Sequence, residues 1–204
     1  MSNDRYSMSF TTGSLFYRES VNMAKLYLDL GDWGSVRDKV IAENLLQARA
    51  INSLKRVCNE IVSRLKTMNL GELEFLVEGS PQDQAYLLWL AVCRRYKFIS
   101  DFAIEVLHER FITLKNDLSY EDFDSFFNRK SEWHLELEEI APATRIKLRQ
   151  VLFKILREAD LITTNNMINA AMLSPRLIEL INQGSRRDVL HFPVFESDLK
   201  RMTR

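Results

Sequence analysis

NSLKRVCNEIVSRLKTM, residues 52–68, is the stretch that decides the fold. Its apolar side chains recur every three or four residues, which places them along one side of a helix. The polar and basic side chains fall on the other side, so the helix can bury one face and expose the other. The apolar positions are Leu54, Val57, Cys58, Ile61, Leu65 and Met68.

Similar helical patterns with start signals recur along the whole chain, and they predict an all-α fold built as a single globular multi-helix domain. The chain has only six Gly and four Pro, which argues against a turn-rich all-β fold. The pattern predicts the following helices: one capped by Ser14 and ending near Gly31, one after Gly34 and Ser35, one beginning near Asn52 or Ser53, one after Ser80-Pro81, one over residues 99–114, one after a capping box at Ser119–Asp122, one over residues 144–159 and one after Ser174-Pro175.

Charge is distributed unevenly although the formal net charge of the 204 residues is zero. Residues 1–70 carry a net charge of +3, residues 71–140 of −8 and residues 141–204 of +5. Two basic ends around an acidic middle suggest a protein that contacts a polyanion at two places. We expect residues 1–204 to form one compact unit with a helix-turn-helix part (1–70), an acidic helical middle (71–140) and a basic winged-helix-like part (141–204).

The sequence LITTNNMI, residues 161–168, interrupts the helical pattern. Its β-branched residues lie on both sides of an Asn-Asn pair, and Asn tolerates positive φ angles. A small hairpin here would suit the wing of a winged-helix unit. A plain loop is the other interpretation, and the sequence does not choose between them.

The first candidate DNA-binding surface lies on the helix of residues 52–68. At 100° per residue, Lys55, Asn59 and Lys66 lie within about 40° of one another, opposite the apolar stripe. Asn can pair with adenine, and Lys or Arg with guanine or phosphate, as on a recognition helix. A basic amphipathic helix is nevertheless more often a solvated face. The candidate residues are Arg49, Ser53, Lys55, Arg56, Asn59, Ser63 and Lys66.

The helix of residues 144–159 gives a second candidate surface. Lys147, Gln150, Lys154 and Arg157 share one face of it, whereas Arg145 and Arg149 lie together elsewhere on its circumference. Basic residues near a helix C-terminus are also favoured by the helix dipole, which is the structural alternative for Lys154 and Arg157.

No pattern for catalysis or metal binding is visible, so we expect no enzymatic activity, no metal and no cofactor. His108, His134 and His191 are far apart, and the glycines form no phosphate-binding loop. The chain has no apolar run of the roughly 20 residues that a membrane span needs, and its polar start does not resemble a signal peptide. We therefore expect a cytoplasmic protein with no membrane partner and no small-molecule substrate.

Four blocks together resemble one family, the component A (BrxA) proteins of bacterial BREX phage-exclusion systems. The resemblance implies an all-α protein with helix-turn-helix elements beside basic surfaces that binds double-stranded DNA. It also implies service in a multi-protein defence system that contains a DNA methyltransferase. The blocks are YSMSFTTGSLFYRES (6–20), AENLLQARAINSLKRVCNEIVSRLKTM (42–68), LVEGSPQDQAYLLWLAVCRRYKFI (76–99) and ATRIKLRQVLFKILREADLI (143–162).

Three hypotheses about function follow. The first is a non-enzymatic subunit that binds double-stranded DNA within a BREX system. The second is a protein–protein adaptor whose acidic middle, near residues 132–139, docks larger BREX subunits. The third is an RNA-binding helical factor.

Overall fold

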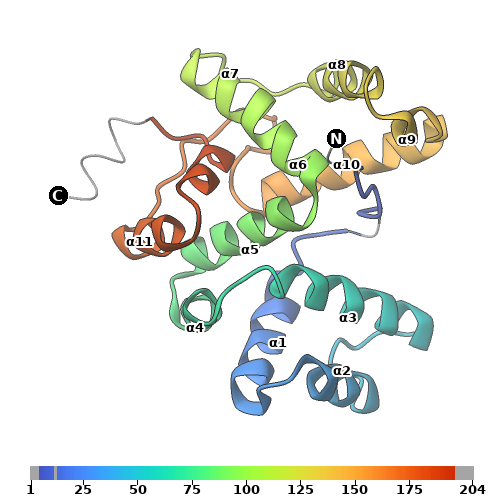
Figure 1. Ribbon diagram of the computed structural model, residues 1–204, viewed down its shortest axis with the longest axis vertical. Coiled ribbons are helices and arrows are strands. Elements are labelled where there is room, and N and C mark those ends of the chain that lie inside the picture. Colours follow the sequence, from blue (N-terminus) through green and yellow to red (C-terminus); the bar gives the residue numbers. More distant parts are fainter. Residues whose placement is uncertain (1–4, 12, 196–204) are drawn as a thin grey trace.

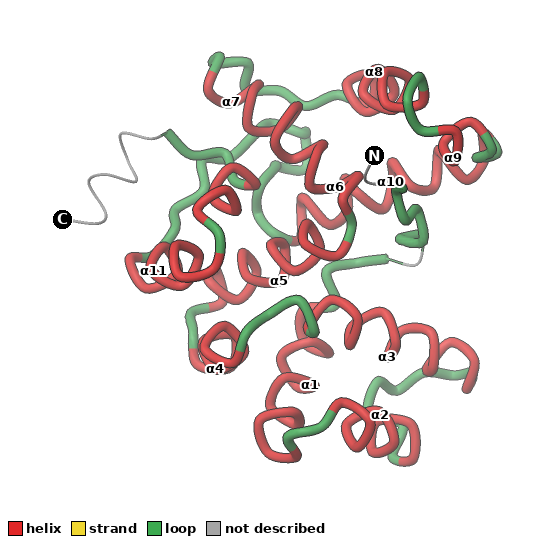
Figure 2. Tube along the Cα trace, in the orientation of Figure 1, coloured by secondary structure: helices red, strands yellow, loops and turns green. Residues whose placement is uncertain are grey.

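The computed structural model describes residues 5–11 and 13–195, and within these ranges every regular element is a helix (Figures 1 and 2). The all-α fold expected from the sequence is therefore confirmed. The elements are α1 (Tyr17–Leu30), α2 (Trp33–Ala42), α3 (Ile51–Leu65), α4 (Leu70–Glu78), α5 (Pro81–Arg95), α6 (Lys97–Phe102), the π-helix η1 (Ala103–His108), α7 (Glu109–Ile112), α8 (Tyr120–Ser131), α9 (Leu135–Glu138), α10 (Pro142–Glu158), α11 (Pro175–Gly184) and the 3-10 helix η2 (Arg186–His191).

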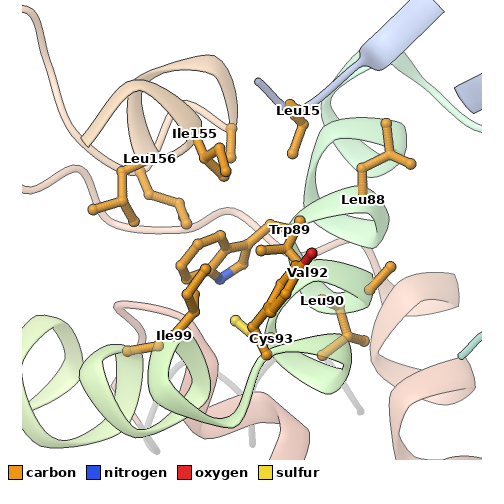
Figure 3. Packing of buried hydrophobic residues seen from close by; sticks show 14 of the residues in the cluster. Leu15, Leu88, Trp89, Leu90, Val92, Cys93, Ile99, Ile155 and Leu156 are labelled. Atoms are coloured by element: carbon orange, nitrogen blue, oxygen red, sulfur yellow. The ribbon is translucent and has the colours of Figure 1, made fainter. Parts of the chain in front are cut away.

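Helix α5 runs through the middle of the molecule, with α1–α3 on one side and α6–α10 on the other (Figure 1). Ser80 caps it by accepting a hydrogen bond from the Asp83 amide, and Pro81 occupies its first turn, as the sequence predicts. Trp89 of α5 is fully buried, and Figure 3 shows it packed among apolar side chains from several elements. Its indole Nε1 donates to the His191 carbonyl oxygen at 2.9 Å, which satisfies the ring's only polar group.

Helices α1, α2 and α3 form the N-terminal part. Gly31 ends α1 in the left-handed conformation (φ 71°), as expected, and the Asp32 side chain caps α2. The predicted cap at Ser14 is wrong, because α1 begins only at Tyr17, and the Ser14 hydroxyl instead accepts from the amide of Phe16. The connection from α2 to α3 spans residues 43–50, which is longer than the roughly three- or four-residue turn typical of helix-turn-helix units.

Residues 161–168 form a tight turn rather than a hairpin of two strands. Ile162 and Ile168 meet in an isolated antiparallel bridge, and Asn166 adopts a positive φ of 61°. Residues 166–168, the second arm of the turn, form backbone hydrogen bonds both with the first arm and with the loop before α8. The amide of Ile168 donates to Asn116, and the carbonyl of Asn166 accepts from Leu118, so the arm pairs with the loop before α8. This division of backbone bonds explains why no paired strands, and hence no wing, develop here.

A buried network around Arg94 joins the C-terminal end of α5 to its neighbours. Both terminal nitrogens of its guanidinium group donate to the Glu72 carboxylate at 2.8 Å, and Nε donates to Asp188 at 2.7 Å. Glu72 is fully buried and also closes a capping box with Asn69 at the start of α4. One guanidinium group therefore connects α4, α5 and η2.

We expect Glu72→Ala to lower the free energy of unfolding by about 3–5 kcal/mol, because it removes one partner of a buried ion pair. Glu74→Ala, on the exposed side of the same helix, is the control and should change it by less than about 0.5 kcal/mol. Urea unfolding followed by circular dichroism measures both. Equal effects of the two substitutions would contradict a structural role for the Arg94 network.

A second expectation concerns pH. Burial lowers the pKa of His191, whose Nδ1 donates to the Asp188 carbonyl and whose Nε2 accepts from the Ser100 hydroxyl. Because the folded-state pKa lies below the ordinary value of about 6.5, the unfolded chain binds the proton more readily. The stability that this neutral imidazole contributes is complete above about pH 6.5 and is lost as the pH falls further. Melting temperatures at neutral and mildly acidic pH should therefore differ less in His191→Asn than in the wild type, and identical differences would refute the assignment.

Candidate nucleic-acid interface

The outer face of α3 carries the first set of candidate residues. Lys55, Asn59 and Lys66 are all exposed, as the helical spacing predicts, and Ser53 and Arg56 are exposed beside them. Arg49 is exposed in the loop that leads into the helix. Within the described part of the chain, none of the four basic residues in this set (Arg49, Lys55, Arg56 and Lys66) forms an ion pair with an acidic side chain. We call this set the α3 surface.

The inner face of α3 is held by Glu60 and Arg64. The Glu60 carboxylate accepts from the Tyr96 hydroxyl at 2.7 Å and from Arg64 Nε at 2.7 Å. Burial, together with this carboxylate, raises the pKa of Tyr96 to about 12. Arg64 is only 3% exposed and lies over the ring of Phe16, so its charge contributes to packing rather than to the outer surface. These contacts fix which side of α3 faces solvent.

Ser63 is half-buried at the edge of the α3 surface, where it meets an arginine of α5. Its hydroxyl donates to the Glu60 carbonyl at 2.8 Å and accepts from Arg95 Nε at 3.3 Å. Arg95 lies over the Tyr96 ring and is a basic residue next to α3 that sequence reasoning missed. The adjacent Arg94-Arg95 pair was the sequence signal for a basic residue here, but the sequence does not show which of the two arginines is the more buried.

The second set of candidate residues, on α10, divides into two groups. Lys147, Gln150 and Lys154 are exposed, and Lys154 lies 3.6 Å from Glu158 one turn away. Arg157 is half-buried and donates to the Asn166 side chain at 2.7 Å, which helps to hold the 161–168 turn. The exposed part of this set is therefore Lys147, Gln150 and Lys154.

Arg145 and Arg149 attach α10 to α8. Both guanidinium groups donate to the Asp124 carboxylate of α8, and each also covers an aromatic ring of that helix. Arg145 lies 4.4 Å from the centroid of Phe127, and Arg149 lies 4.7 Å from that of Tyr120. Their side chains are only 24% and 20% exposed. Arg145 also donates to the Asn128 side chain and to the Asp124 carbonyl oxygen, whereas the Nε of Arg149 is buried without a hydrogen-bond partner among the described residues.

One peptide group links the two basic helices. The carbonyl of the Ser14–Leu15 peptide accepts from Arg64 of α3 at 2.8 Å, and its amide donates to Glu158 of α10 at 2.5 Å. Figure 1 shows the chain before α1 passing between the two helices. The α3 surface and the exposed residues of α10 thus lie on separate helices, whose C-terminal ends are held to the same peptide.

The described residues were also compared with the requirements of a metal site, a reactive cysteine and a membrane-spanning helix. No group of three or more His, Cys, Asp or Glu in residues 5–11 and 13–195 is arranged to hold a metal ion. Cys58 and Cys93 are free and buried, and burial raises the pKa of both thiols, which disfavours the reactive thiolate. No helix in these ranges is long and apolar enough to cross a membrane.

Comparison with known proteins gives the family. The sequence model of the BrxA family matches residues 4–185. The chain belongs to the BrxA family. A BREX protein BrxA from Escherichia coli O9:H4 (strain HS) is 27% identical over 180 residues, covering 87% of this chain and 84% of the relative. Another BREX protein BrxA, from Bacillus cereus (strain H3081.97), is 24% identical over 161 residues, covering 76% of this chain and 80% of the relative.

A solved structure shows the same fold. The crystal structure of an uncharacterized protein from Magnetospirillum magneticum matches with a TM-score of 0.80 at 21% sequence identity. The match covers 93% of this chain and 98% of the other. This match shows that another protein adopts the same helical arrangement. The resemblance expected from the four sequence blocks is confirmed by the BrxA family model and by the BrxA relatives.

We expect Arg149→Ala to lower the free energy of unfolding by about 1–3 kcal/mol, because Asp124 loses a charged hydrogen-bond donor. Lys147→Ala, on the exposed part of the same helix, should change it by less than about 0.5 kcal/mol. Chemical unfolding of both variants measures the difference. If Arg149→Ala is as stable as Lys147→Ala, the attachment of α10 to α8 does not depend on this contact.

Proposed function

We propose that this BrxA-family chain is a non-enzymatic double-stranded DNA-binding subunit of a BREX anti-phage defence system. The assignment to a BREX system is supported by the names of its relatives, each of which is a BREX protein BrxA. The α3 surface is the single observation that carries the binding role. It presents four exposed basic side chains on α3 and in the residues next to its two ends, and none of the four forms an ion pair with a described acidic side chain. The other face of α3 is anchored through Glu60 and Arg64.

The chemistry of the α3 surface suits phosphate contacts with modest base reading. Helix α3 has 15 residues and is about 22 Å long, and the major groove of B-DNA admits one helix. Lys and Arg predominate over amides on this surface, and Lys–phosphate contacts carry no sequence information. Asn59 lies among them and is the side chain best suited to pair with adenine. We therefore expect weak sequence preference.

The exposed residues of α10 provide a second point of contact with the same duplex. Lys147, Gln150 and Lys154 are oriented relative to α3 through the Ser14–Leu15 peptide. Arg145, Arg149 and Arg157 contribute less, because their guanidinium groups are engaged within the protein. Duplex RNA should bind more weakly than duplex DNA, since the deep and narrow major groove of A-form RNA excludes a helix.

A second candidate function is that of an adaptor for larger BREX subunits. It is favoured by residues 132–139, where Trp133 and Leu135 are strongly exposed beside several glutamates. The two functions are compatible, because the α3 surface and residues 132–139 lie on different parts of the molecule (Figure 1).

Lys55→Glu combined with Arg56→Glu should weaken duplex DNA binding at least tenfold and leave the melting temperature nearly unchanged, since both side chains are exposed. For the wild type, neutralisation of roughly five phosphates gives a slope of log K against log salt of about −4 to −5, and the variant should have a shallower slope. Fluorescence anisotropy with labelled duplex DNA over a range of salt concentrations measures both quantities.

The matched control is Arg186→Glu with Arg187→Glu, an exposed adjacent basic pair in η2 that changes the net charge equally. It should retain most of the wild-type affinity. Equal losses in the two double variants would mean that net charge rather than the α3 surface determines binding. Undetectable binding of the wild type at low salt would refute the DNA hypothesis.

A further inference from the structure

Residues 132–139 carry the two most exposed large apolar side chains among the described residues. Trp133 is 83% exposed and Leu135 is 73% exposed, and they are two positions apart in the sequence. Single exposed apolar residues are normal on a protein surface, whereas neighbouring ones often mark an interaction site. Tryptophan is also among the residues that contribute most to the binding energy of protein interfaces. We call this segment the 132–139 surface.

The backbone under these two side chains is held to the rest of the protein. Leu137 is buried, and the Glu136 carboxylate accepts a hydrogen bond from the Tyr6 amide at 2.6 Å. The centroid of the His134 ring lies 4.0 Å from that of the Tyr6 ring. The inward-facing residues therefore anchor the segment, and the two exposed side chains stand on an ordered backbone. A surface that is already ordered loses less conformational entropy when it binds.

The charge around the exposed side chains is negative. The sequence SEWHLELEEIAPAT, residues 131–144, contains four glutamates and no lysine or arginine. The basic residues just before it, Arg129 and Lys130, are already paired with Glu105. Three of the four glutamates are exposed and form no ion pair with a described residue, namely Glu132, Glu138 and Glu139. The 132–139 surface therefore combines apolar side chains with acidic charge that the described residues do not compensate.

This combination of apolar anchors and an acidic rim determines which partner chemistry fits. Duplex DNA does not fit, because the carboxylates repel its phosphate groups. An anionic membrane surface is disfavoured for the same reason. A protein surface with an apolar pocket among lysine and arginine side chains matches both features, because the pocket takes the tryptophan and the bases compensate the glutamates.

We propose that the 132–139 surface docks on a basic surface of another subunit of the BREX system. Trp133 enters an apolar pocket of that subunit, and the glutamates face its lysines and arginines. This inference rests on the adaptor function proposed above, and it adds which residues make the contact and what chemistry the partner offers. Two apolar anchors with a charged rim make a contact smaller than the roughly 1,200 Å² of a standard interface, so it is transient and weakens as salt rises.

The proposed contact leaves the α3 surface open. The two surfaces lie on different parts of the molecule (Figure 1), so duplex DNA and the partner subunit can be bound at the same time. The acidic rim keeps the duplex away from the apolar anchors, so the DNA does not compete for the 132–139 surface. The chain would then bring the partner subunit to DNA.

Binding measurements with the immobilised full chain test the contact, with each of the other purified subunits of the same BREX system as the probe in turn. One of these subunits should bind at low salt and bind more weakly near about 1 M salt, where the Debye length is about 3 Å. Trp133→Ala should weaken this binding at least tenfold, and so should Glu138→Lys with Glu139→Lys. Both variants should keep the wild-type circular dichroism spectrum and melting temperature, because the altered side chains are exposed.

Two control variants match these changes on other segments. Glu74→Lys with Glu78→Lys changes the net charge equally at two exposed glutamates of α4. Leu114→Ala removes an apolar side chain that is 72% exposed in the loop after α7. Both controls should bind the subunit as the wild type does. An equal loss in the α4 variant would overturn the proposal in favour of an effect of net charge, and an equal loss in Leu114→Ala would overturn it in favour of unspecific apolar contact.

Duplex DNA titrations of the same proteins separate this inference from the proposed DNA-binding function. Trp133→Ala should keep the wild-type affinity for DNA, and Lys55→Glu with Arg56→Glu should keep the wild-type affinity for the subunit. A subunit that binds Trp133→Ala as tightly as the wild type would overturn the 132–139 contact and leave the adaptor function to another surface. Absence of binding by every subunit would overturn both the contact and the adaptor function, whereas the DNA titration tests DNA binding independently.

Discussion

The arrangement of the helices depends on how the charge of Arg94 is compensated inside the protein. Its guanidinium group reaches Glu72 of α4, Asp188 of η2 and the carbonyl of Thr67 just after α3. A buried charge is costly unless it is fully hydrogen-bonded, so these three partners must be present together. The apolar packing around Trp89 attracts the helices to one another without fixing their directions. The directional bonds of Arg94 determine where α4 and the C-terminal segment lie against α5.

The Ser14–Leu15 peptide has the same role for the two basic helices. A backbone peptide offers one donor and one acceptor, and here Glu158 and Arg64 satisfy them from opposite helices. Because a peptide group is planar and rigid, the C-terminal ends of α3 and α10 are held to a short, stiff connection. The exposed bases of α3 and α10 therefore keep a fixed position relative to each other.

Much of the fold could be predicted from local signals. The caps at Ser80, Ser119 and Ser174 and the terminating Gly31 act on neighbouring residues, so the sequence contains all that determines them. Arg145 and Arg149 show where such reasoning ends. Their spacing on α10 resembles a basic surface, but their partner Asp124 is 21 and 25 residues away in sequence. A guanidinium group that is free to bind phosphate and one that is paired across a helix contact have the same local pattern.

The uneven charge of the sequence is interpreted differently when the charges that form ion pairs within the protein are left out of the count. Part of the negative charge of residues 71–140 compensates arginines and lysines of neighbouring elements, as Asp122 does for Arg110 and Glu105 for Arg129. Only charges without internal partners produce a field that a ligand encounters, because paired charges largely cancel at distances beyond the pair. Among the described residues, the exposed charges that form no ion pair include Lys55 and Arg56 on α3 and Glu138 and Glu139 at the end of α9. The basic excess of residues 1–70 therefore contributes to the external field only where the fold leaves its bases outside ion pairs, as at Lys55 and Arg56 of α3, whereas Arg64 of the same helix is neutralised by Glu60 inside the protein.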